Sequence, residues 1–278
     1  MNRPAWAPPE IDIERPSPAR IYDYHLGGNH NFAADRQAAE QIAAIMPELP
    51  LIMRANRAFL ARAVHFLVDA GIRQFLDLGS GIPTVGNVHE IAQRAAPGSR
   101  VAYVDLDPVA VAHSQALLRG NPDAVAVHAD LRDTERVLAR PEIRKLIDFS
   151  QPVGVLMVAV LHFVPDRDDP AGIVARYRDA VAPGSYLVLS HAAASEDEQA
   201  PTGANAATAA YSRNVMEATL RTRAEVTDLL AGFELIDPGV AYVTQWHPVE
   251  AQEAEAPPPQ RLAQLVGVGR KPSVEPTG

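Results

Sequence analysis

The strongest indication of the fold is the stretch Gln74-Phe75-Leu76-Asp77-Leu78-Gly79-Ser80-Gly81-Ile82-Pro83-Thr84. Its first half is a short, mostly apolar run of the kind that forms a buried strand. The glycines that follow allow the backbone to approach a ligand closely, and a helix expected over 85–95 would offer free N–H groups beside them. In open α/β sheets such a turn lies at the carboxyl end of a strand, where ligands bind.

Strand and helix patterns alternate on the carboxyl-terminal side of this stretch. Repeated alternation of this kind predicts an α/β fold with a parallel, doubly wound sheet. Further strands are expected over 101–105, 124–129, 152–160 and 185–190, with late strands over 233–236 and 262–268. Further helices are expected over 107–120, 170–181, 204–220 and 223–230.

The amino-terminal part has a different character. Prolines recur through residues 1–20 and predict an extended arm. Residues 22–32 mix aromatic residues, glycines and asparagines without periodicity, which predicts either a turn cluster or a binding loop. A helix is then expected from an Asp35 N-cap to about Met46, and a longer one ends at Gly71.

Composition excludes several classes of protein. The 278 residues include no cysteine, which excludes a disulfide scaffold, a thiolate metal site and a cysteine nucleophile, and fits a cytoplasmic protein. The net charge of −9 and the lack of a Lys/Arg run make nucleic acid a poor partner. The apolar run at 153–161 is too short to span a bilayer, so no membrane is expected. Nothing predicts a metal site.

Three acidic residues lie at the ends of three successive predicted strands: Asp77, Asp105 and Asp130. Each by itself also fits a turn or capping residue. Together, at one edge of a parallel sheet, they outline sites for an ammonium group, for ribose hydroxyls and for the amine of adenine, in that order along the chain. That combination predicts a pocket for S-adenosyl-L-methionine. A dinucleotide site is disfavoured because Thr84 replaces the third glycine of the usual fingerprint.

A histidine follows the fourth predicted strand, where the methyl group of such a cofactor would point. His162 could act as a general base, because its unperturbed pKa lies near neutrality. The alternative is a histidine packed beside Phe163. His191, at the end of the fifth predicted strand, has the same two interpretations.

Longer motifs resemble one family. The sequence is similar to a largely actinobacterial group of S-adenosyl-L-methionine-dependent methyltransferases, formerly a domain of unknown function, within the class I methyltransferase superfamily. The resemblance covers about residues 10–270. It rests on residues 17–28, Asn31-Phe32, Asp35-Arg36, 56–59, 74–84, 87–89, 104–108 and 161–163. Pro83 departs from the wider superfamily, in which a further glycine is common.

The resemblance implies a Rossmann-like fold with a mostly parallel seven-stranded sheet and an amino-terminal helical cap. Residues 1–70 would form the arm, lid loop and cap, and 71–278 the cofactor-binding core of one structural unit. It also implies the site. The methionine part would contact Asp77, Gly79, Ser80 and Gly81, the ribose Asp105 with Leu106, and the adenine Asp130 with Leu131. The implied lid residues are Tyr22, Tyr24, Gly28, Asn31 and Phe32, and the implied partner of the cofactor carboxylate is Arg57.

The sequence therefore predicts a methyltransferase that acts on a small molecule. Methyl transfer from a sulfonium is an in-line displacement, and the protein supplies placement. Two alternatives stay open: a sensor or scaffold that binds the cofactor without turnover, and a nicotinamide-dependent oxidoreductase. Tyr22 and Tyr24 would either face the sulfonium and acceptor or simply pack the lid. The helices over 204–230 would shape the acceptor pocket or pack a homodimer.

Overall fold

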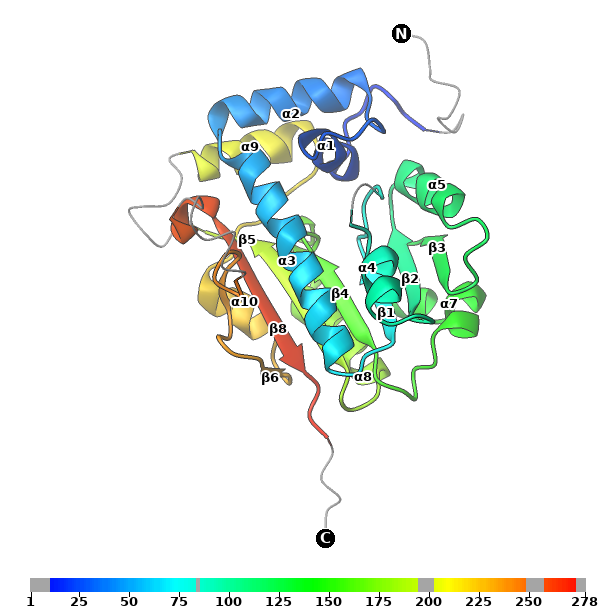
Figure 1. Ribbon diagram of the computed structural model, residues 1–278. Coiled ribbons are helices and arrows are strands. Elements are labelled where there is room, and N and C mark those ends of the chain that lie inside the picture. The colour runs from blue at the N-terminus through cyan, green and yellow to red at the C-terminus, as the bar shows by residue number, and fades with distance from the viewer. Residues whose placement is uncertain (1–10, 84–85, 195–202, 249–257, 274–278) are drawn as a thin grey trace.

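The computed structural model describes residues 11–83, 86–194, 203–248 and 258–273 (Figure 1). Expectations for the proline arm up to residue 10, for Thr84 and the helix start at Val85, and for most of the acidic 250–259 segment lie outside those ranges. Within them, no helix is long and apolar enough to cross a membrane.

The centre of the molecule is one sheet in the order β3-β2-β1-β4-β5-β8-β6, with β7 paired to β8. The first five of these strands are parallel, as predicted, and β8 runs antiparallel to β5, β6 and β7. The strands are β1 (Gln74–Leu78), β2 (Arg100–Asp105), β3 (Ala124–His128), β4 (Gly154–Val158), β5 (Tyr186–Ala192), β6 (Glu234–Leu235), β7 (Ala241–Tyr242) and β8 (Gln264–Arg270). The predicted seven-stranded sheet is thus confirmed along the main path, and the two-residue strand β7 adds to it.

Helices cover both faces of this sheet (Figure 1). One face packs against α3 (Leu49–Asp69) and α4 (Val88–Ala95). The other packs against α6 (Thr134–Leu138), α7 (Pro141–Leu146), α8 (Pro170–Ala180) and α10 (Arg223–Leu229). Because both faces are covered, every residue of β1 is buried, which explains why its sequence is apolar throughout apart from Gln74 and Asp77.

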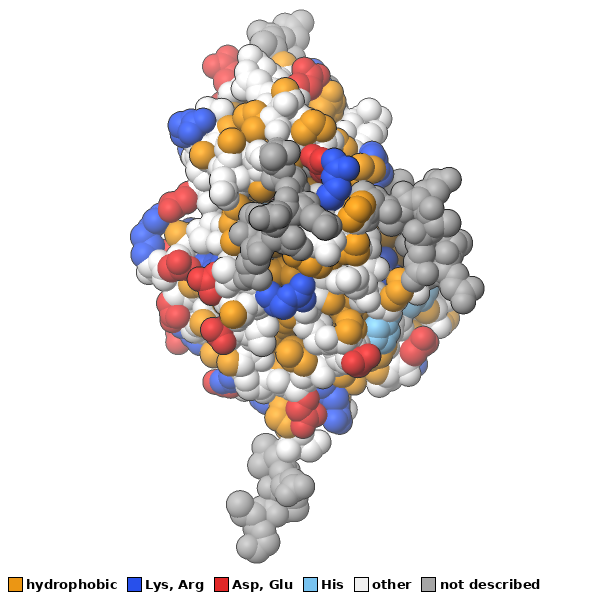
Figure 2. Space-filling model, turned by 90° about the vertical axis from the view of Figure 1, so that its left-hand side faces the viewer, with side chains coloured by type: hydrophobic (Ala, Val, Ile, Leu, Met, Phe, Trp, Pro, Cys, Tyr) orange, Lys and Arg blue, Asp and Glu red, His pale blue; other side chains and the backbone are white. Residues whose placement is uncertain are grey.

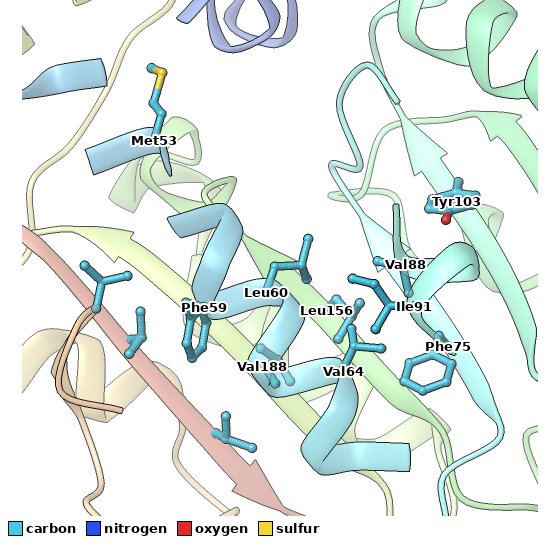
Figure 3. Close-up of a cluster of buried hydrophobic side chains, with 14 of the residues drawn as sticks. Met53, Phe59, Leu60, Val64, Phe75, Val88, Ile91, Tyr103, Leu156 and Val188 are labelled. Carbon is cyan, nitrogen blue, oxygen red and sulfur yellow. The ribbon is translucent and has the colours of Figure 1, made fainter. Parts of the chain in front are cut away.

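Helix α3 joins the amino-terminal region to the sheet. Its buried residues recur at helical spacing, and Phe59, Leu60 and Val64 lie in the same apolar cluster as Leu156 of β4 and Val188 of β5 (Figure 3). Each fully buried side chain of this kind contributes about 1.5–3 kcal/mol. The amino-terminal region therefore shares its core with the sheet.

Above the carboxyl ends of the strands lies a cap of three helices, α1 (Pro18–His25), α2 (Ala33–Ile45) and α9 (Ala204–Asn214) (Figure 1). The expectation that residues up to 20 are extended and that 22–32 form a loop is wrong for α1. Pro18 stands in its first turn, where a proline loses no hydrogen bond. Gly27, with φ +80°, follows the helix in the left-handed region.

Several predicted boundaries need correction. Helix α2 begins two residues before Asp35, which caps it from the third position by accepting a hydrogen bond from the Phe32 N–H (2.7 Å). Helix α9 ends at Asn214 rather than near 220. Helix α5 (Pro108–Leu117) agrees with the prediction, since the Asp107 side chain accepts a hydrogen bond from the Val109 N–H (2.7 Å).

Candidate functional site

A cavity of about 520 Å³ opens at the carboxyl ends of the parallel strands, beneath the cap. It lies where the chain order reverses, because β1 is followed outward by β2 and β3 and the chain then returns to β4 on the other side. One lobe is lined by the loops after β1, β2 and β3. We call this part the first lobe, and the part lined by α2, α3, α9 and residues 216–218 and 220 the second lobe.

Asp77 is a buried acidic group of the first lobe that has no hydrogen-bond donor among the described residues. It belongs to β1, is 6% exposed and lines the cavity. No described residue donates a hydrogen bond to its carboxylate. Burial raises the pKa of Asp77 to about 7, against the opposing charge of Arg57. A buried carboxylate without a hydrogen-bond donor suits a positively charged ligand group.

The glycine turn that follows β1 is shaped by close packing. Gly79 has φ +75°, and a Cβ there would lie 2.3 Å from Cγ2 of Val160. Gly81 has φ +67°, but a Cβ there would meet no atom within 4 Å. The N–H groups of Gly79 and Ser80 both donate to the Val104 carbonyl, at 2.8 and 3.2 Å, so β2 fixes the turn.

Asp105 lies at the end of β2 and holds the same turn from the side. Its carboxylate accepts hydrogen bonds from the N–H groups of Gly81 and Asp107, both at 2.7 Å. Burial raises the pKa of Asp105 to about 6, although these hydrogen bonds oppose the rise. Each oxygen keeps a further lone pair for a ligand hydroxyl. Leu106 beside it is 49% exposed and lines the cavity.

Asp130 and Leu131, after β3, also line the first lobe. Arg132 donates to both oxygens of Asp130, at 2.6–3.0 Å, and also binds Asp168 at 2.8 Å. Partial burial raises the pKa of Asp130, but the hydrogen bonds and charge of Arg132 outweigh it, and the net pKa is lowered. An adenine amine would share this carboxylate with Arg132.

A hydrogen-bonded chain connects the cap to the sheet at the middle of the cavity. The Tyr22 hydroxyl donates to the Met53 carbonyl (3.0 Å) and accepts from Nδ2 of Asn56 (3.1 Å). Oδ1 of Asn56 accepts from the Ser190 hydroxyl (2.6 Å), which accepts from the Ala159 N–H (2.8 Å). Tyr22, Asn56 and Ala159 line the cavity, and sequence reasoning did not single out Asn56 or Ser190.

The Tyr22 ring also lies under Arg57, whose guanidinium carbon is 5.6 Å from the ring centroid. Both residues line the cavity. Ala159 has φ +56°, a strained conformation for a residue with a Cβ. Strain at the end of β4, beside the glycine turn, is typical of a functional loop.

The remaining predicted lid residues lie outside the cavity wall. Asn31 donates to Asp23 (2.8 Å) and to the Gly28 carbonyl (3.0 Å). A Cβ on Gly28 would lie 1.9 Å from Oδ1 of Asp23.

Phe32 packs in an apolar cluster with Ile82 of the glycine turn and with Val109 and Ala110 of α5. Tyr24 donates to Glu40 on the surface. In this structure these residues brace the cap; a direct contact with cofactor stays a prediction.

His162 lines the cavity between Phe163 and His191. Its Nδ1 is buried and has no hydrogen-bond partner, so Nε2 is the ring atom that an acceptor could reach. Burial lowers the pKa of His162 well below its usual value, and the charges of His191 and Arg221 lower it further. The ring is therefore neutral near pH 7.

His191 has a structural role instead. Arg221 donates to its Nε2 (2.7 Å), which leaves Nδ1 to donate to the Ala192 carbonyl (2.8 Å). Burial lowers the pKa of His191 to about 4. Arg221 is itself buried and binds Asp166 (2.6 Å), so these groups anchor the loops after β4 and β5.

The second lobe was not predicted residue by residue. Its wall is mostly apolar and combines distant segments: Ile42, Met46, Leu49, Ile52, Met53, Leu60, Phe163, Ala204, Ala207, Thr208, Tyr211, Met216, Ala263 and Gln264. The contribution of α9 favours the acceptor-pocket interpretation of the 204–230 region. The only sequence expectation for this lobe was that the helices over 204–230 would shape the acceptor pocket or pack a homodimer.

These features agree with the hydrogen-bond acceptors that the ammonium, ribose and adenine groups of S-adenosylmethionine need. An unsatisfied buried carboxylate lies near the end of β1, a second carboxylate with free lone pairs lies at the end of β2, and a third follows β3. The fold and this site define a class I S-adenosylmethionine-dependent methyltransferase of Rossmann-like fold. More narrowly, residues 4–272 match the family model of S-adenosyl methyltransferases, and the chain belongs to that family, whose cofactor is S-adenosyl-L-methionine.

Solved structures agree with this assignment. A proposed methyltransferase from Thermobifida fusca YX is 39% identical, with a TM-score of 0.90, and the match covers 97% of this chain and all of that one. A DUF574 family protein from Streptomyces avermitilis MA-4680 is 42% identical, with a TM-score of 0.90, over 95% of this chain and all of that one.

A more distant similarity shows the fold alone. Human N-acetylserotonin methyltransferase in complex with S-adenosylmethionine is 16% identical, with a TM-score of 0.50, over 94% of this chain and 64% of that one. No curated protein matches the chain.

Proposed function

We propose that this protein transfers the methyl group of S-adenosylmethionine to a small-molecule acceptor bound in the second lobe of the cavity. The observation that carries the proposal is the continuity of the two lobes, since one cavity joins the acid-lined loops after β1–β3 to the apolar space beneath α9. A protein that only sensed the cofactor would not need the second lobe.

The cofactor supplies the chemistry, an electrophilic methyl group on a sulfonium. The protein supplies binding and orientation. Asp77 holds the ammonium group, Asp105 accepts from the ribose hydroxyls, and Asp130 with Leu131 borders the adenine. Arg57 binds the carboxylate while its charge also favours ionised Asp77. Placement of both reactants in one cavity can supply several kcal/mol of the barrier reduction.

His162 is the proposed group for the acceptor proton. Its low pKa keeps a neutral imidazole available at Nε2, but it also makes the ring a weak base. His162 therefore assists acceptors whose own proton is acidic, and it orients others by hydrogen bonding. Replacement by alanine should lower turnover on a hydroxyl acceptor; full turnover on the true acceptor would remove this role.

The proposal favours a small molecule over a nucleic acid. The net charge is −9. On the face shown in Figure 2, acidic and basic side chains are interspersed, and apolar side chains gather around its middle. Nucleic-acid binding needs clustered cations that neutralise phosphates.

Transfer of labelled methyl from S-adenosylmethionine into a small-molecule fraction of cell extract tests the proposal. We expect label in a product below protein size, and none with heat-denatured enzyme or with Asp77→Asn at limiting cofactor. A tight cofactor complex with no labelled product would support the sensor alternative. Label only in macromolecules would contradict the small-molecule acceptor.

A further inference from the structure

The second lobe has an aromatic wall built from three residues of two elements. His162 and Phe163 belong to the short 3-10 helix at Leu161–Phe163, after β4, and Tyr211 belongs to α9. The ring centroids are 4.2 Å apart for His162 and Phe163, and 5.6 Å apart for Phe163 and Tyr211, whose planes are within 26° of parallel. All three residues line the cavity, and an aromatic ligand can extend such a row by stacking or by edge contacts.

Much of the remaining wall of the lobe is apolar and adaptable. Three of the five methionines of the sequence, Met46, Met53 and Met216, line it. Methionine fills irregular gaps and makes favourable sulfur–aromatic contacts. Figure 3 shows Met53 on α3, set apart from the other labelled side chains of its apolar cluster.

Most of the charged residues that line the cavity are matched with opposite charges. Arg167 binds Glu217 through two contacts, at 2.5 and 2.9 Å, and Arg132 binds Asp130 and Asp168. Arg57 interacts electrostatically with Asp77. No charged side chain on the described wall of the second lobe is left over to hold a carboxylate, a phosphate or an amine of the acceptor, and burying an unmatched charge there would be costly.

Polar groups in the lobe are neutral. The Tyr211 hydroxyl has no hydrogen-bond partner among the described residues, and burial raises the pKa of Tyr211 well above its usual value. Gln264, at the start of β8, is 4% exposed, and its Nε2 is buried without a partner. A half-turn of this amide exchanges the positions of Nε2 and Oε1, so that Nε2 can donate into the cavity. The buried atom without a partner is then the oxygen, which costs less to leave unsatisfied than an N–H group.

We propose that the acceptor is an uncharged, flat aromatic molecule that lies against Phe163 and Tyr211, with an oxygen that accepts a hydrogen bond from Gln264. This inference rests on the proposed function and adds the chemical class of the acceptor. Aromatic contacts supply affinity, and the neutral amide supplies orientation without a charge to desolvate.

The test is a binding titration with protein saturated by S-adenosylhomocysteine. The probes are three neutral hydroxylated bicyclic aromatics with a ring carbonyl, including 7-hydroxycoumarin at a pH where its hydroxyl is protonated. Matched probes are 7-hydroxycoumarin-3-carboxylate, an aminomethyl analogue and a saturated bicyclic alcohol. We expect a neutral aromatic to bind at least about tenfold more tightly than its charged and saturated analogues, a difference of about 1.4 kcal/mol.

Variants separate the ring from the hydroxyl and the amide. Tyr211→Leu should weaken binding of the neutral aromatic probe by about tenfold, while Tyr211→Phe should keep most of the affinity. Gln264→Met should weaken it by about three- to tenfold, as expected for one hydrogen bond. In the folded protein Nε2 of Gln264 makes no hydrogen bond with a described residue, so Gln264→Met removes none there. The melting temperature of this variant should therefore not fall. Gln115→Met is the matched control, since Gln115 lies outside the cavity and binds the Ala126 carbonyl.

The outcomes distinguish the two proposals. Failure of S-adenosylhomocysteine to bind would contradict the proposed function itself. If it binds but charged probes bind more tightly, or no neutral aromatic binds, the acceptor class is wrong while the cofactor site stands. Equal losses in Tyr211→Leu and Tyr211→Phe would assign the effect to the hydroxyl and overturn the aromatic wall.

Discussion

Asp77 links the chemistry of the site to solution pH. Its raised pKa of about 7 means that the free protein holds a neutral carboxyl at low pH and a carboxylate at high pH. The ammonium group of the cofactor favours the carboxylate. We therefore expect affinity for S-adenosylmethionine to fall as pH decreases below about 7, approaching tenfold per pH unit, because a proton must leave before the ammonium binds. Calorimetric titrations between pH 5.5 and 8.5 measure this slope.

Substitution of Asp77 provides the control for that slope. Asp77→Asn should weaken binding by about 10- to 100-fold near pH 8, as expected for a lost charged hydrogen bond. It should also remove the pH dependence near 7 and leave a weaker one near the pKa of Asp105, about 6. Asp179→Asn changes an exposed side chain and should alter neither the affinity nor its pH dependence. An unchanged pH slope in Asp77→Asn would show that another group carries it.

Single residues could be predicted where chemistry follows strand order. Asp77, Asp105 and Asp130 line one lobe because the ends of adjacent parallel strands meet at one edge of the sheet. Gln264 and Tyr211 could not be predicted, because β8 and α9 are brought to the cavity by long-range packing that leaves no local spacing. Phe32 was predicted as a lid residue from its motif, but in the structure it packs against Ile82 and α5.

At the level of elements, the glycine turn allows a paired test. Gly79→Ala adds a Cβ that would lie 2.3 Å from Cγ2 of Val160, and alanine is strained at the left-handed φ of this position, so the turn must move away from its place beside β2. We expect it to weaken cofactor binding by at least about tenfold. Gly81→Ala meets open space and carries only the backbone strain, about 1–2 kcal/mol. It should lower stability more than it alters the shape of the turn.

Comparison of the two variants needs both a melting temperature and a cofactor titration. If Gly79→Ala binds the cofactor as tightly as the unaltered protein, packing against Val160 does not shape the site. If the cofactor lies close to Gly81, Gly81→Ala will also lose affinity, and that result would place the cofactor against the open side of this glycine.

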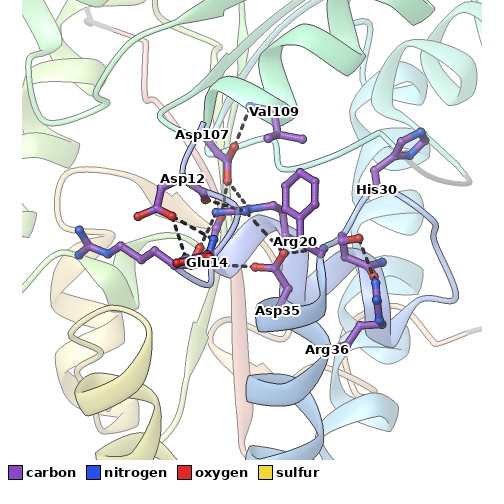
Figure 4. A network of polar contacts seen from close by, with 12 residues as sticks. Asp12, Glu14, Arg20, His30, Asp35, Arg36, Asp107 and Val109 are labelled. Atoms are coloured by element: carbon purple, nitrogen blue, oxygen red, sulfur yellow. Dashed lines mark hydrogen bonds and ion pairs between the residues drawn. The ribbon is translucent and has the colours of Figure 1, made fainter. Parts of the chain in front are cut away.

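The cap is held to the core by a buried ionic cluster (Figure 4). Arg20 of α1 lies 3.6 Å from Asp35 of α2 and 3.3 Å from Asp107, the N-cap of α5. The Ser17 hydroxyl also donates to Asp107. All of these side chains are nearly buried, so loss of the cation would leave two carboxylates without it in a low-dielectric site.

Arg20→Leu should therefore lower the free energy of unfolding by about 3–5 kcal/mol. The matched control is Arg167→Leu, which breaks an exposed ion pair with Glu217 and should cost at most about 1 kcal/mol. Urea titrations of both variants measure the difference. Similarly small losses of unfolding free energy in both variants would mean that the cluster contributes no more than an exposed ion pair and does not hold the cap to the core.

Element types were easier to predict than element ends and directions. The core strands followed from continuous apolar runs, and α5 from its Asp-Pro start. Helix α1 was missed because its eight residues lie between a proline-rich arm and two glycines, where local propensity argues against a helix and packing on α2 and α3 decides. The antiparallel direction of β8 has no local signal, since strand direction depends on the preceding connection.

At the level of the whole molecule, cap and sheet share one apolar core. The largest cluster includes Ile42 and Phe59 from the amino-terminal region and Phe75 and Val188 from the sheet. We therefore expect residues up to 70 and the core to unfold in one transition, with fluorescence and circular dichroism midpoints that coincide. Saturation with S-adenosylhomocysteine at 100 times its Kd should add about 2.7 kcal/mol to that single transition. Two separated transitions would contradict a shared core.

Binding of S-adenosylmethionine is assigned to the lobe bordered by Asp77, Asp105 and Asp130. A calorimetric titration of the unaltered protein with S-adenosylmethionine at pH 8, with NADH in a parallel cell, tests it most directly. The predicted result is saturable binding of S-adenosylmethionine at one site per chain and no binding of NADH. Absence of saturable binding of S-adenosylmethionine, or tighter binding of NADH, would contradict the account.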